Sequence, residues 1–340
     1  MSVIMKPGAS EQDLKNVLRA IESRGLKTDI MHGEFQKVIG IIGDEKKIAL
    51  DQIKSMPGVQ DAITIQVPYR LVSRQYIQKD VVVKVGDVSI GGENPPVYIS
   101  GPCSIESYDQ LFRIARKVKE SGASILRGGA FKPRTSVHSF QGLGLEGLKH
   151  LAEVGKDLGI PTITEVRSEL DVKTVAKHTD ALQIGARNMY NQDLIEAAAR
   201  TGKPVLLKRS FSAQIDEYLG FAERIAANRN KKIILCERGI LPLGGSFRPQ
   251  TRYTFDLNAV PVLKKETPFP VIADPSHATG RRDLILPMSR AAIACGANGL
   301  MVEVHDRPQE ALSDAAQAFP PSELGSLISS CNRVYESIRG

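Results

Sequence analysis

No apolar run in this 340-residue sequence approaches the roughly 18 residues that a membrane-spanning helix requires. The amino-terminal stretch MSVIMKPGASEQDLKNV also lacks the apolar segment of a secretory signal. We therefore expect a cytoplasmic protein without a membrane partner.

Cysteine is scarce, with four residues at positions 103, 236, 295 and 331. Such few and widely spaced cysteines argue against a disulfide framework. The sequence contains no CxxC pair, so it gives no indication of a structural zinc site. Any role must belong to an individual cysteine. Cys236, Cys295 and Cys331 have no companion motif, and we expect them to be packing residues.

Tryptophan is absent, and so is a tail of lysine and arginine residues. The 45 basic and 38 acidic side chains leave a net charge of +7, which suits nucleic acid, anionic substrates or a merely basic surface. Pairs of adjacent basic residues are scattered, and several basic residues fall at the ends of expected strands. This distribution favours small anionic substrates over a polynucleotide.

The chain is longer than most single domains, and its 42% hydrophobic content can form a sizeable core. Residues 1–70 predict a small domain with the order βαββαβ, in the segments 2–6, 11–25, 26–33, 36–43, 45–56 and 59–67. This order is that of a ferredoxin-like module, a type that is often regulatory or oligomerising. Residues 71–96 predict a linker and a β-hairpin with its turn at Gly86-Asp87.

Residues 97–340 alternate between apolar β-type runs and helical segments, several of which end at glycine. The eight runs are 97–104, 124–131, 161–166, 181–187, 204–210, 232–239, 269–276 and 299–305. This pattern predicts an α/β fold, a (β/α)8 TIM barrel. The alternative is an open doubly wound sheet, but no GxGxxG opens a helix after the first strand and no P-loop is present.

Charged residues end these runs almost every time, at the edge where a barrel enzyme has its active site. The cations among them are Arg127, Lys132, Arg187, Lys208 and Arg238. Each alone could form a surface ion pair, but together in one cavity they would repel one another unless an anion were bound. Arginine forks and lysine point charges suit a ligand that carries phosphate and carboxylate groups.

Four residues that can bind metals come from segments that a closed barrel would bring together. Cys103, His277, Glu303 and Asp314 lie at or after the first, seventh and eighth strands, which become neighbours on closure. Each alone is more often a packing or hydrogen-bonded residue. As a set, thiolate, imidazole and two carboxylates suit one divalent ion of Mn, Fe, Co or Zn at a catalytic site. His305 would support a ligand or act as a cap.

Eight specific motifs are distributed along nearly the whole barrel part of the chain. They are GPCS at 101–104, LRGGAFKPRTS at 126–136, FQGLG at 140–144, QIGARNM at 183–189, LLKRS at 206–210, ILCERG at 234–239, DPSHATGRRD at 274–283 and EVH at 303–305. Together they resemble the 3-deoxy-D-arabino-heptulosonate 7-phosphate (DAHP) synthase family, in the type I subgroup with an amino-terminal ferredoxin-like domain.

The resemblance implies a transferase of the shikimate pathway, which leads to the aromatic amino acids. Its reaction would be a metal-dependent, aldol-like condensation of phosphoenolpyruvate with D-erythrose 4-phosphate and water. The runner-up is the sister enzyme 3-deoxy-D-manno-octulosonate 8-phosphate synthase, which uses arabinose 5-phosphate. That family has a KANRTS-like segment where this chain has KPRTS, which favours erythrose 4-phosphate.

The resemblance also implies roles for individual residues. It implies metal ligands at Cys103, His277, Glu303 and Asp314, phosphoenolpyruvate contacts at Arg127, Lys132, Arg187, Lys208 and Arg238, and contacts to the erythrose 4-phosphate phosphate group at Arg134 and Thr135. Lys132 would be the general acid, with Glu165 and His277 as alternatives for proton transfer. Asp314 differs from the other three implied ligands, because it lies in the helical-looking stretch EALSDAAQ rather than at the end of a strand.

The ferredoxin-like domain of this subgroup implies feedback inhibition by tyrosine or phenylalanine, in a homo-oligomer for which a tetramer is favoured. The alternative is a domain that only packs the oligomer. A second alternative for the whole chain is a noncatalytic barrel that binds phosphate or RNA, which predicts basic residues spread over an outer face and no need for the four ligands.

Overall fold

The computed structural model describes residues 1–32, 36–43, 47–63, 67–132, 138, 140–242 and 250–339. The chain divides into two compact units, residues 1–78 and residues 79–340. Within the described part of the chain, no helix is long and apolar enough to cross a membrane.

The first unit is an antiparallel sheet with two helices, which confirms the predicted ferredoxin-like module. Its elements are β1 (Ser2–Met5), α1 (Glu11–Glu22), β2 (Lys27–His32), β3 (Lys37–Ile42), α2 (Leu50–Lys54), β4 (Val59–Ile63) and the 3-10 turn η2 (Arg70–Val72). The strands pair in the order β2-β3-β1-β4. Both helices contribute to one core: Val17 and Ile21 of α1 and Ile53 of α2 are buried with β1 and β3.

Helix α1 begins where the sequence predicts it, at a capping box. The hydroxyl of Ser10 accepts a hydrogen bond from the Asp13 amide at 3.0 Å, and the Asp13 carboxylate accepts one from the Ser10 amide at 3.2 Å. Helix α2 is shorter than the expected span 45–56. It starts at Leu50, because Ala49 has an extended backbone with ψ of 126°; residues 44–46 lie outside the described part.

The segment that follows the sheet packs within the first unit as far as Gln78. Tyr76 is buried, and its hydroxyl donates to the Asp29 carboxylate on β2 at 3.1 Å. The Tyr76 ring lies against Gly40 of β3, where a Cβ atom would come within 2.4 Å of the Tyr76 hydroxyl. Glycine at position 40 therefore makes room for this aromatic side chain.

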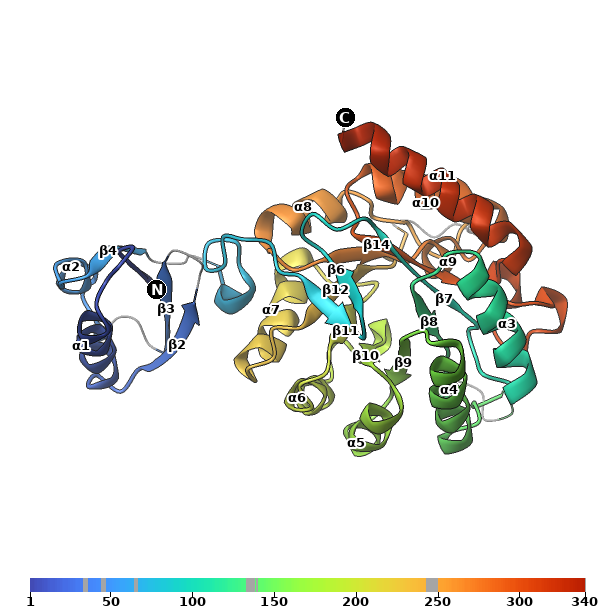
Figure 1. Ribbon diagram of the computed structural model, residues 1–340, viewed down its shortest axis with the longest axis horizontal. Helices are drawn as coiled ribbons and strands as arrows, with labels where there is room; N and C mark the ends of the chain where they lie inside the picture. Colours follow the sequence, from blue (N-terminus) through green and yellow to red (C-terminus); the bar gives the residue numbers. More distant parts are fainter. Residues whose placement is uncertain are drawn as a thin grey trace. The chain divides into compact units, whose positions relative to one another are not determined.

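The second unit is a closed parallel barrel, as the sequence predicts (Figure 1). Its strands are β7 (Val97–Gly101), β8 (Ile125–Arg127), β9 (Thr162–Val166), β10 (Ala181–Ile184), β11 (Val205–Lys208), β12 (Ile233–Glu237), β13 (Val271–Ala273) and β14 (Gly299–Glu303). Strand β14 pairs with both β13 and β7, and Glu303 lies opposite Gly101. The seventh, eighth and first strands of the barrel are therefore neighbours.

Helices surround the strands in Figure 1, and along the chain each barrel strand is followed by at least one helix. They are α3 (Tyr108–Glu120), α4 (Leu145–Leu158), α5 (Glu169–His178), α6 (Gln192–Arg200), α7 (Ile215–Ala227), α8 (Ala259–Glu266), α9 (Pro275–Thr279), α10 (Arg282–Ala294) and α11 (Pro321–Arg339). Short 3-10 turns are η3 (Ala186–Asn188), η4 (Pro308–Glu310) and η5 (Ala315–Gln317).

A β-hairpin lies against the amino-terminal ends of the barrel strands. Strands β5 (Val83–Val85) and β6 (Val88–Ile90) flank the turn, and their buried residues share a core cluster with the apolar residues inside the barrel. A Cβ atom on Gly86 would meet Pro161, the residue before β9, at 2.9 Å. The hairpin therefore covers apolar residues at this end, whereas the active sites of such barrels lie at the carboxyl ends of the strands.

Candidate active site

A polar layer lies above the apolar interior of the barrel. The core cluster contains Ile125, Ile163, Leu206, Cys236, Ile272 and Met301. Successive side chains of a strand alternate between faces, so the residue two positions further on also points inward. Those residues are Arg127, Glu165, Lys208, Arg238, Asp274 and Glu303. Strand periodicity therefore places the polar residues of six different strands at one end of the barrel.

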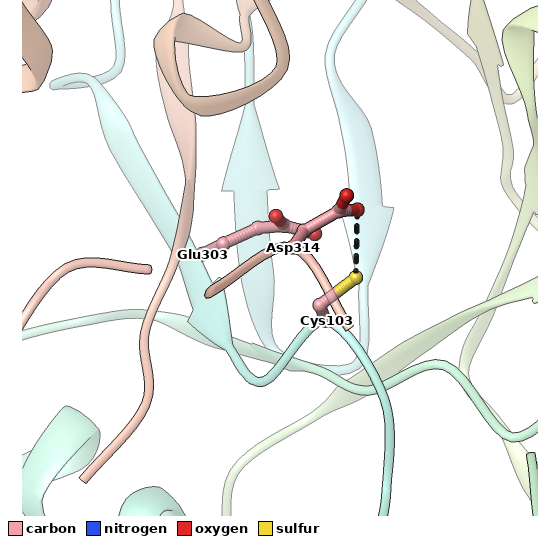
Figure 2. Close-up of side chains that lie close together, drawn as sticks. All are labelled: Cys103, Glu303 and Asp314. Atoms are coloured by element: carbon pink, nitrogen blue, oxygen red, sulfur yellow. Dashed lines mark hydrogen bonds between the residues drawn. The ribbon is translucent and has the colours of Figure 1, made fainter. Parts of the chain in front are cut away.

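Three of the four expected metal ligands lie together at this end. The ligand atoms of Cys103, Glu303 and Asp314 all lie within 4.8 Å of one another, and Cys103 Sγ is 3.2 Å from Asp314 Oδ2. Figure 2 shows the three side chains converging: Cys103 comes from the loop after β7, Glu303 ends β14, and Asp314 approaches from the following segment. Cys103 and Glu303 are buried.

Asp314 does not lie in the helical stretch that the sequence suggests. It precedes the 3-10 turn η5 and has a left-handed backbone with φ of 48°. Aspartate tolerates this conformation better than most residues that carry a Cβ atom. The turn directs the Asp314 carboxylate toward Cys103, so a residue outside any barrel strand joins the cluster.

His277 adjoins this cluster through Glu303 but is not within 4.8 Å of all three ligand atoms. Its Nε2 atom lies 3.3 Å from Glu303 Oε1. Asp274, the N-cap of α9, holds the ring from behind: its carboxylate accepts from His277 Nδ1 at 2.7 Å and from the His277 amide at 3.0 Å. This contact assigns the ring proton to Nδ1 and leaves the Nε2 lone pair available to a metal ion.

Burial sets the protonation of the cluster. Burial raises the pKa of the Cys103 thiol to about 12, and the Glu303 carboxylate acts in the same direction. Burial lowers the pKa of His277, even though Asp274 and Glu303 oppose this, which favours the neutral imidazole. Burial would raise the pKa of Glu303, but the electrostatic effects of His277, Arg127 and Lys132 together outweigh burial and lower that pKa.

These residues fit a divalent metal ion. They offer one sulfur, one neutral imidazole nitrogen and two carboxylates, a mixed donor set that suits first-row transition metals. A buried thiol beside two carboxylates needs a cation to exist as a thiolate, and metal binding supplies that charge. Cys103, Glu303 and Asp314 would hold the ion, and His277 could complete the set from the position it occupies next to Glu303.

Two cations lie directly beside the cluster. Arg127 ends β8 and donates from NH1 to Glu303 Oε1 at 2.7 Å. Lys132 is buried, and its Nζ atom lies 3.1 Å from Cys103 Sγ. Gly129 makes this position possible, because a Cβ atom there would come within 2.7 Å of Lys132 Nζ.

The other three expected anion-binding residues differ in their surroundings. Lys208 is buried at the end of β11 and donates to the Asp274 carboxylate. Arg238 is buried after β12, with its guanidinium 4.0 Å from the centre of the Tyr253 ring; its NH1 atom has no hydrogen-bond partner among the described residues. Arg187 lies on η3 and is exposed.

Glu165 forms its hydrogen bond outside the metal-type cluster of Cys103, Glu303 and Asp314. It accepts from Gln183 Nε2 at 3.1 Å, across the pair of strands β9 and β10. A Cβ atom on Gly185 would collide with its carboxylate at 2.1 Å, so glycine makes room for Glu165. Arg134 and Thr135, the expected contacts to erythrose 4-phosphate, lie outside the described residues.

Known protein families match both parts of the chain. The DAHP synthase ferredoxin-like domain matches residues 1–67, and the DAHP synthetase I family matches residues 71–338. The chain belongs to the DAHP synthetase I family. Membership makes it an enzyme, a transferase with DAHP synthase activity, and overturns the alternative of a noncatalytic barrel.

Individual relatives agree with this assignment. Phospho-2-dehydro-3-deoxyheptonate aldolase of Thermotoga maritima is 44% identical over 338 residues, 99% of this chain and 98% of that protein. Its crystal structure superimposes with a TM-score of 0.77, and a truncated form of the Thermotoga maritima synthase, 43% identical, covers 80% of this chain and 98% of its own with a TM-score of 0.73. A 2-dehydro-3-deoxyphosphooctonate aldolase of Geotalea uraniireducens is 34% identical, covering 72% of this chain and 94% of that protein.

The structure adds residues to this DAHP synthase site that sequence reasoning did not select. Asp274 carries a signal in the sequence, since it directly follows strand β13 and lies three positions before His277. Gln317 and Arg252 contact the Glu303 and Asp314 carboxylates but come from segments without regular periodicity. Tyr253 lies under Arg238. His305, expected to be a support or a cap, accepts from the Arg307 amide at Nδ1 and lies 3.2 Å from Gln110.

Proposed function

We propose that the pocket at the carboxyl ends of the barrel strands condenses phosphoenolpyruvate with erythrose 4-phosphate beside a single divalent metal ion. The observation that carries this proposal is the buried group of Cys103, Glu303 and Asp314, with Arg127 and Lys132 directly against it. Metal-type ligands and cations within one buried site suit a reaction between two anionic substrates.

In this proposal the cations hold phosphoenolpyruvate by its phosphate and carboxylate groups. Arg127, Lys132, Lys208 and Arg238 are buried, so their interactions with an anion are stronger than in water. Arg187 is exposed and would contact the ligand from the rim of the site. Among the described residues the NH1 atom of Arg238 has no hydrogen-bond partner, which supports the assignment, because a buried guanidinium N–H without an acceptor is costly unless a ligand supplies one.

Arg134 and Thr135 would bind the phosphate of erythrose 4-phosphate. With both substrates bound, C3 of phosphoenolpyruvate attacks the aldehyde carbon, and a proton goes to the aldehyde oxygen. Water adds at C2, the C–O bond to the phosphate breaks, and DAHP and inorganic phosphate leave. The metal ion, when bound, supplies Lewis-acid polarisation of a carbonyl oxygen.

Lys132 is the proposed proton donor. Its buried ammonium lies beside Cys103, within the ring of cations, and so near both proposed substrates. Glu165 and His277 are the alternatives for proton transfer. Arg127 and Lys208 are already paired with Glu303 and Asp274 and act as fixed charges that orient the substrates.

An assay of phosphate release tests the proposal. Purified enzyme should release phosphate from phosphoenolpyruvate with erythrose 4-phosphate, lose this activity after treatment with a chelator, and regain it with added Mn²⁺, Co²⁺, Zn²⁺ or Fe²⁺. Equal or faster release with arabinose 5-phosphate would favour the sister reaction. Full activity of rigorously metal-free enzyme would exclude the metal role.

The amino-terminal unit is proposed to be regulatory. Residues 1–67 match a domain that is named for DAHP synthases, and the unit has its own core. We expect tyrosine or phenylalanine to inhibit the enzyme at a site between the amino-terminal domains of neighbouring subunits in a homotetramer. Light scattering measures the assembly. A variant without residues 1–78 should keep its activity and lose inhibition; unchanged inhibition would assign the domain to packing alone.

A further inference from the structure

Gln317 connects Glu303, which belongs to the metal-type cluster, to Arg252, which comes from a segment outside the cluster. It is 2% exposed and ends the 3-10 turn η5. Its Nε2 atom donates to Glu303 Oε2 at 2.5 Å, and its Oε1 atom accepts from Arg252 NH1 at 3.0 Å. The buried amide therefore joins Glu303 to Arg252.

The orientation of the Gln317 amide follows from its partners. An ionised carboxylate can only accept hydrogen bonds, and a guanidinium can only donate them. The NH₂ group must therefore face Glu303 and the carbonyl oxygen must face Arg252. A flipped amide would lose both bonds, so the arrangement is held in one state.

Arg252 contacts the second carboxylate of the cluster. The same NH1 atom lies 3.4 Å from Asp314 Oδ1. The Arg252 backbone is fixed as well, because its amide donates to the Thr279 carbonyl at the end of α9 at 2.9 Å. Gly280 allows this approach, since a Cβ atom there would meet Arg252 Cβ at 2.6 Å. Arg252 is thus anchored to the short helix that carries His277.

We propose that Arg252 and Gln317 are positioning residues, which hold the Glu303 and Asp314 carboxylates at the spacing that a divalent metal ion requires. This inference rests on the metal ion of the proposed function. Gln317 fixes the Glu303 oxygen that Arg127 leaves free, since Arg127 bonds Oε1 and Gln317 bonds Oε2. Arg252 lies 3.4 Å from Asp314 Oδ1 and so holds the carboxylate of a residue whose left-handed backbone needs support from its surroundings. Hydrogen-bonded partners behind metal ligands typically contribute about 10- to 100-fold in metal affinity.

The test measures Co²⁺ binding in the absence of substrates, by competition with a chromophoric chelator and by the thiolate-to-Co²⁺ absorption. Gln317→Met preserves side-chain length and removes both hydrogen bonds. Arg252→Gln removes the charge, and Arg252→Lys restores it. Arg290→Gln is the matched control, because Arg290 on α10 donates to Ser330 on α11 and, among the described residues, has no hydrogen bond or ion pair to the cluster.

We expect Gln317→Met to weaken Co²⁺ binding by about 10- to 100-fold and to change the absorption band. Arg252→Gln should weaken it less, because Arg252 is 32% exposed and its charge is partly screened. Arg252→Lys should recover part of the loss, and Arg290→Gln should bind like the wild type. The double variant should lose less than the sum of the two single losses, because the two residues share one hydrogen bond.

Wild-type Co²⁺ affinity and absorption in both single variants would overturn the proposal, and so would a wild-type protein that binds no Co²⁺. If Gln317→Met does not fold, the partly exposed Arg252→Gln decides alone. The outcome is independent of the reaction: a wild-type enzyme that binds Co²⁺ but releases no phosphate would count against the proposed function and not against the positioning role.

Discussion

The ammonium group of Lys132 lies 3.1 Å from the sulfur of Cys103, although Lys132 belongs to the loop after β8 and Cys103 to the loop after β7. Gly129 leaves the space for this contact. Lys132, one of the cations that are proposed to bind phosphoenolpyruvate, therefore lies directly beside the metal-type cluster. The Lys132 ammonium group can both attract an anionic substrate and donate a proton, and the proposed reaction needs both roles beside the cluster.

Two substitutions of Lys132 should distinguish the role of its charge from its role as a proton donor. We expect Lys132→Met and Lys132→Arg both to lower kcat by about 10²- to 10⁴-fold, because arginine keeps the charge but does not release its proton. Steady-state phosphate release measures the effect, with Co²⁺ absorption as a check on the metal site. If Lys132→Arg keeps the wild-type kcat, the residue acts as a charge, and the proton donor must be Glu165 or His277.

Cys103→Ala should abolish metal-dependent turnover without unfolding the barrel. The side chain ends at the cluster and is small, so its loss removes a ligand and little apolar contact. Chelator-sensitive activity and thermal unfolding measure the two effects. Cys331→Ala is the matched control, since Cys331 is also buried, on α11, and does not belong to the close group of Cys103, Glu303 and Asp314. A Cys103→Ala enzyme that is active after metal removal would refute the assignment.

Arg238 should contribute to phosphoenolpyruvate binding through a bidentate contact. A charge-assisted hydrogen bond contributes about 1.5–3 kcal/mol, so Arg238→Lys should raise the KM for phosphoenolpyruvate by about 10- to 100-fold. Tyr253→Leu should raise it less, by removing the ring that supports the guanidinium, whereas Tyr253→Phe keeps the ring and should behave like the wild type. A normal KM in Arg238→Lys would exclude a specific guanidinium contact.

The buried Glu237 gives a prediction for the pH dependence of stability. Burial raises its pKa above the ordinary 4.5, although Arg209 opposes this. The folded state therefore retains a proton that the unfolded chain releases, and this contribution to stability is present below pH 4.5 and lost as the pH rises through the folded-state pKa. Glu237→Gln should remove that loss, which urea unfolding across this pH range would measure.

Arg209 provides the contrast to this substitution. Its guanidinium donates to both Glu237 and Asp256, at 3.0 and 2.7 Å. Arg209→Met should cost about 3–5 kcal/mol at neutral pH, because two carboxylates lose their partner. Equal stability of Arg209→Met and Glu237→Gln, or a Glu237→Gln variant with the wild-type pH profile, would contradict this account.

The strand ends show how far sequence periodicity reaches. Alternation along each strand places Arg127, Lys208 and Glu303 on the inner face, and closure of eight parallel strands brings their ends to one rim. The convergence of Cys103 with Glu303 follows from the same closure, because β14 pairs with β7. Local pattern and one topological rule are enough for these residues.

Other features of the site depend on contacts that no period in the sequence encodes. Asp314 reaches the cluster through a left-handed residue before a 3-10 turn, in a stretch whose composition suggests a helix. Gln317 and Arg252 meet from segments 65 positions apart and become partners only when both pack above the barrel. Such contacts depend on loop conformation, which side-chain patterns do not determine.

The sequence by itself determined the barrel, the ferredoxin-like module and the strand-end charges, because apolar periodicity is local and repeats along the chain, and alternating strands and helices favour a closed parallel sheet. Only the tertiary structure decided that Asp314 completes the close group with Cys103 and Glu303, that His277 adjoins this group through Glu303, and that Arg252 and Gln317 lie behind the carboxylates. The physical reason is that hydrogen bonds between distant loops form at distances near 3 Å, and only the folded backbone brings these groups so close.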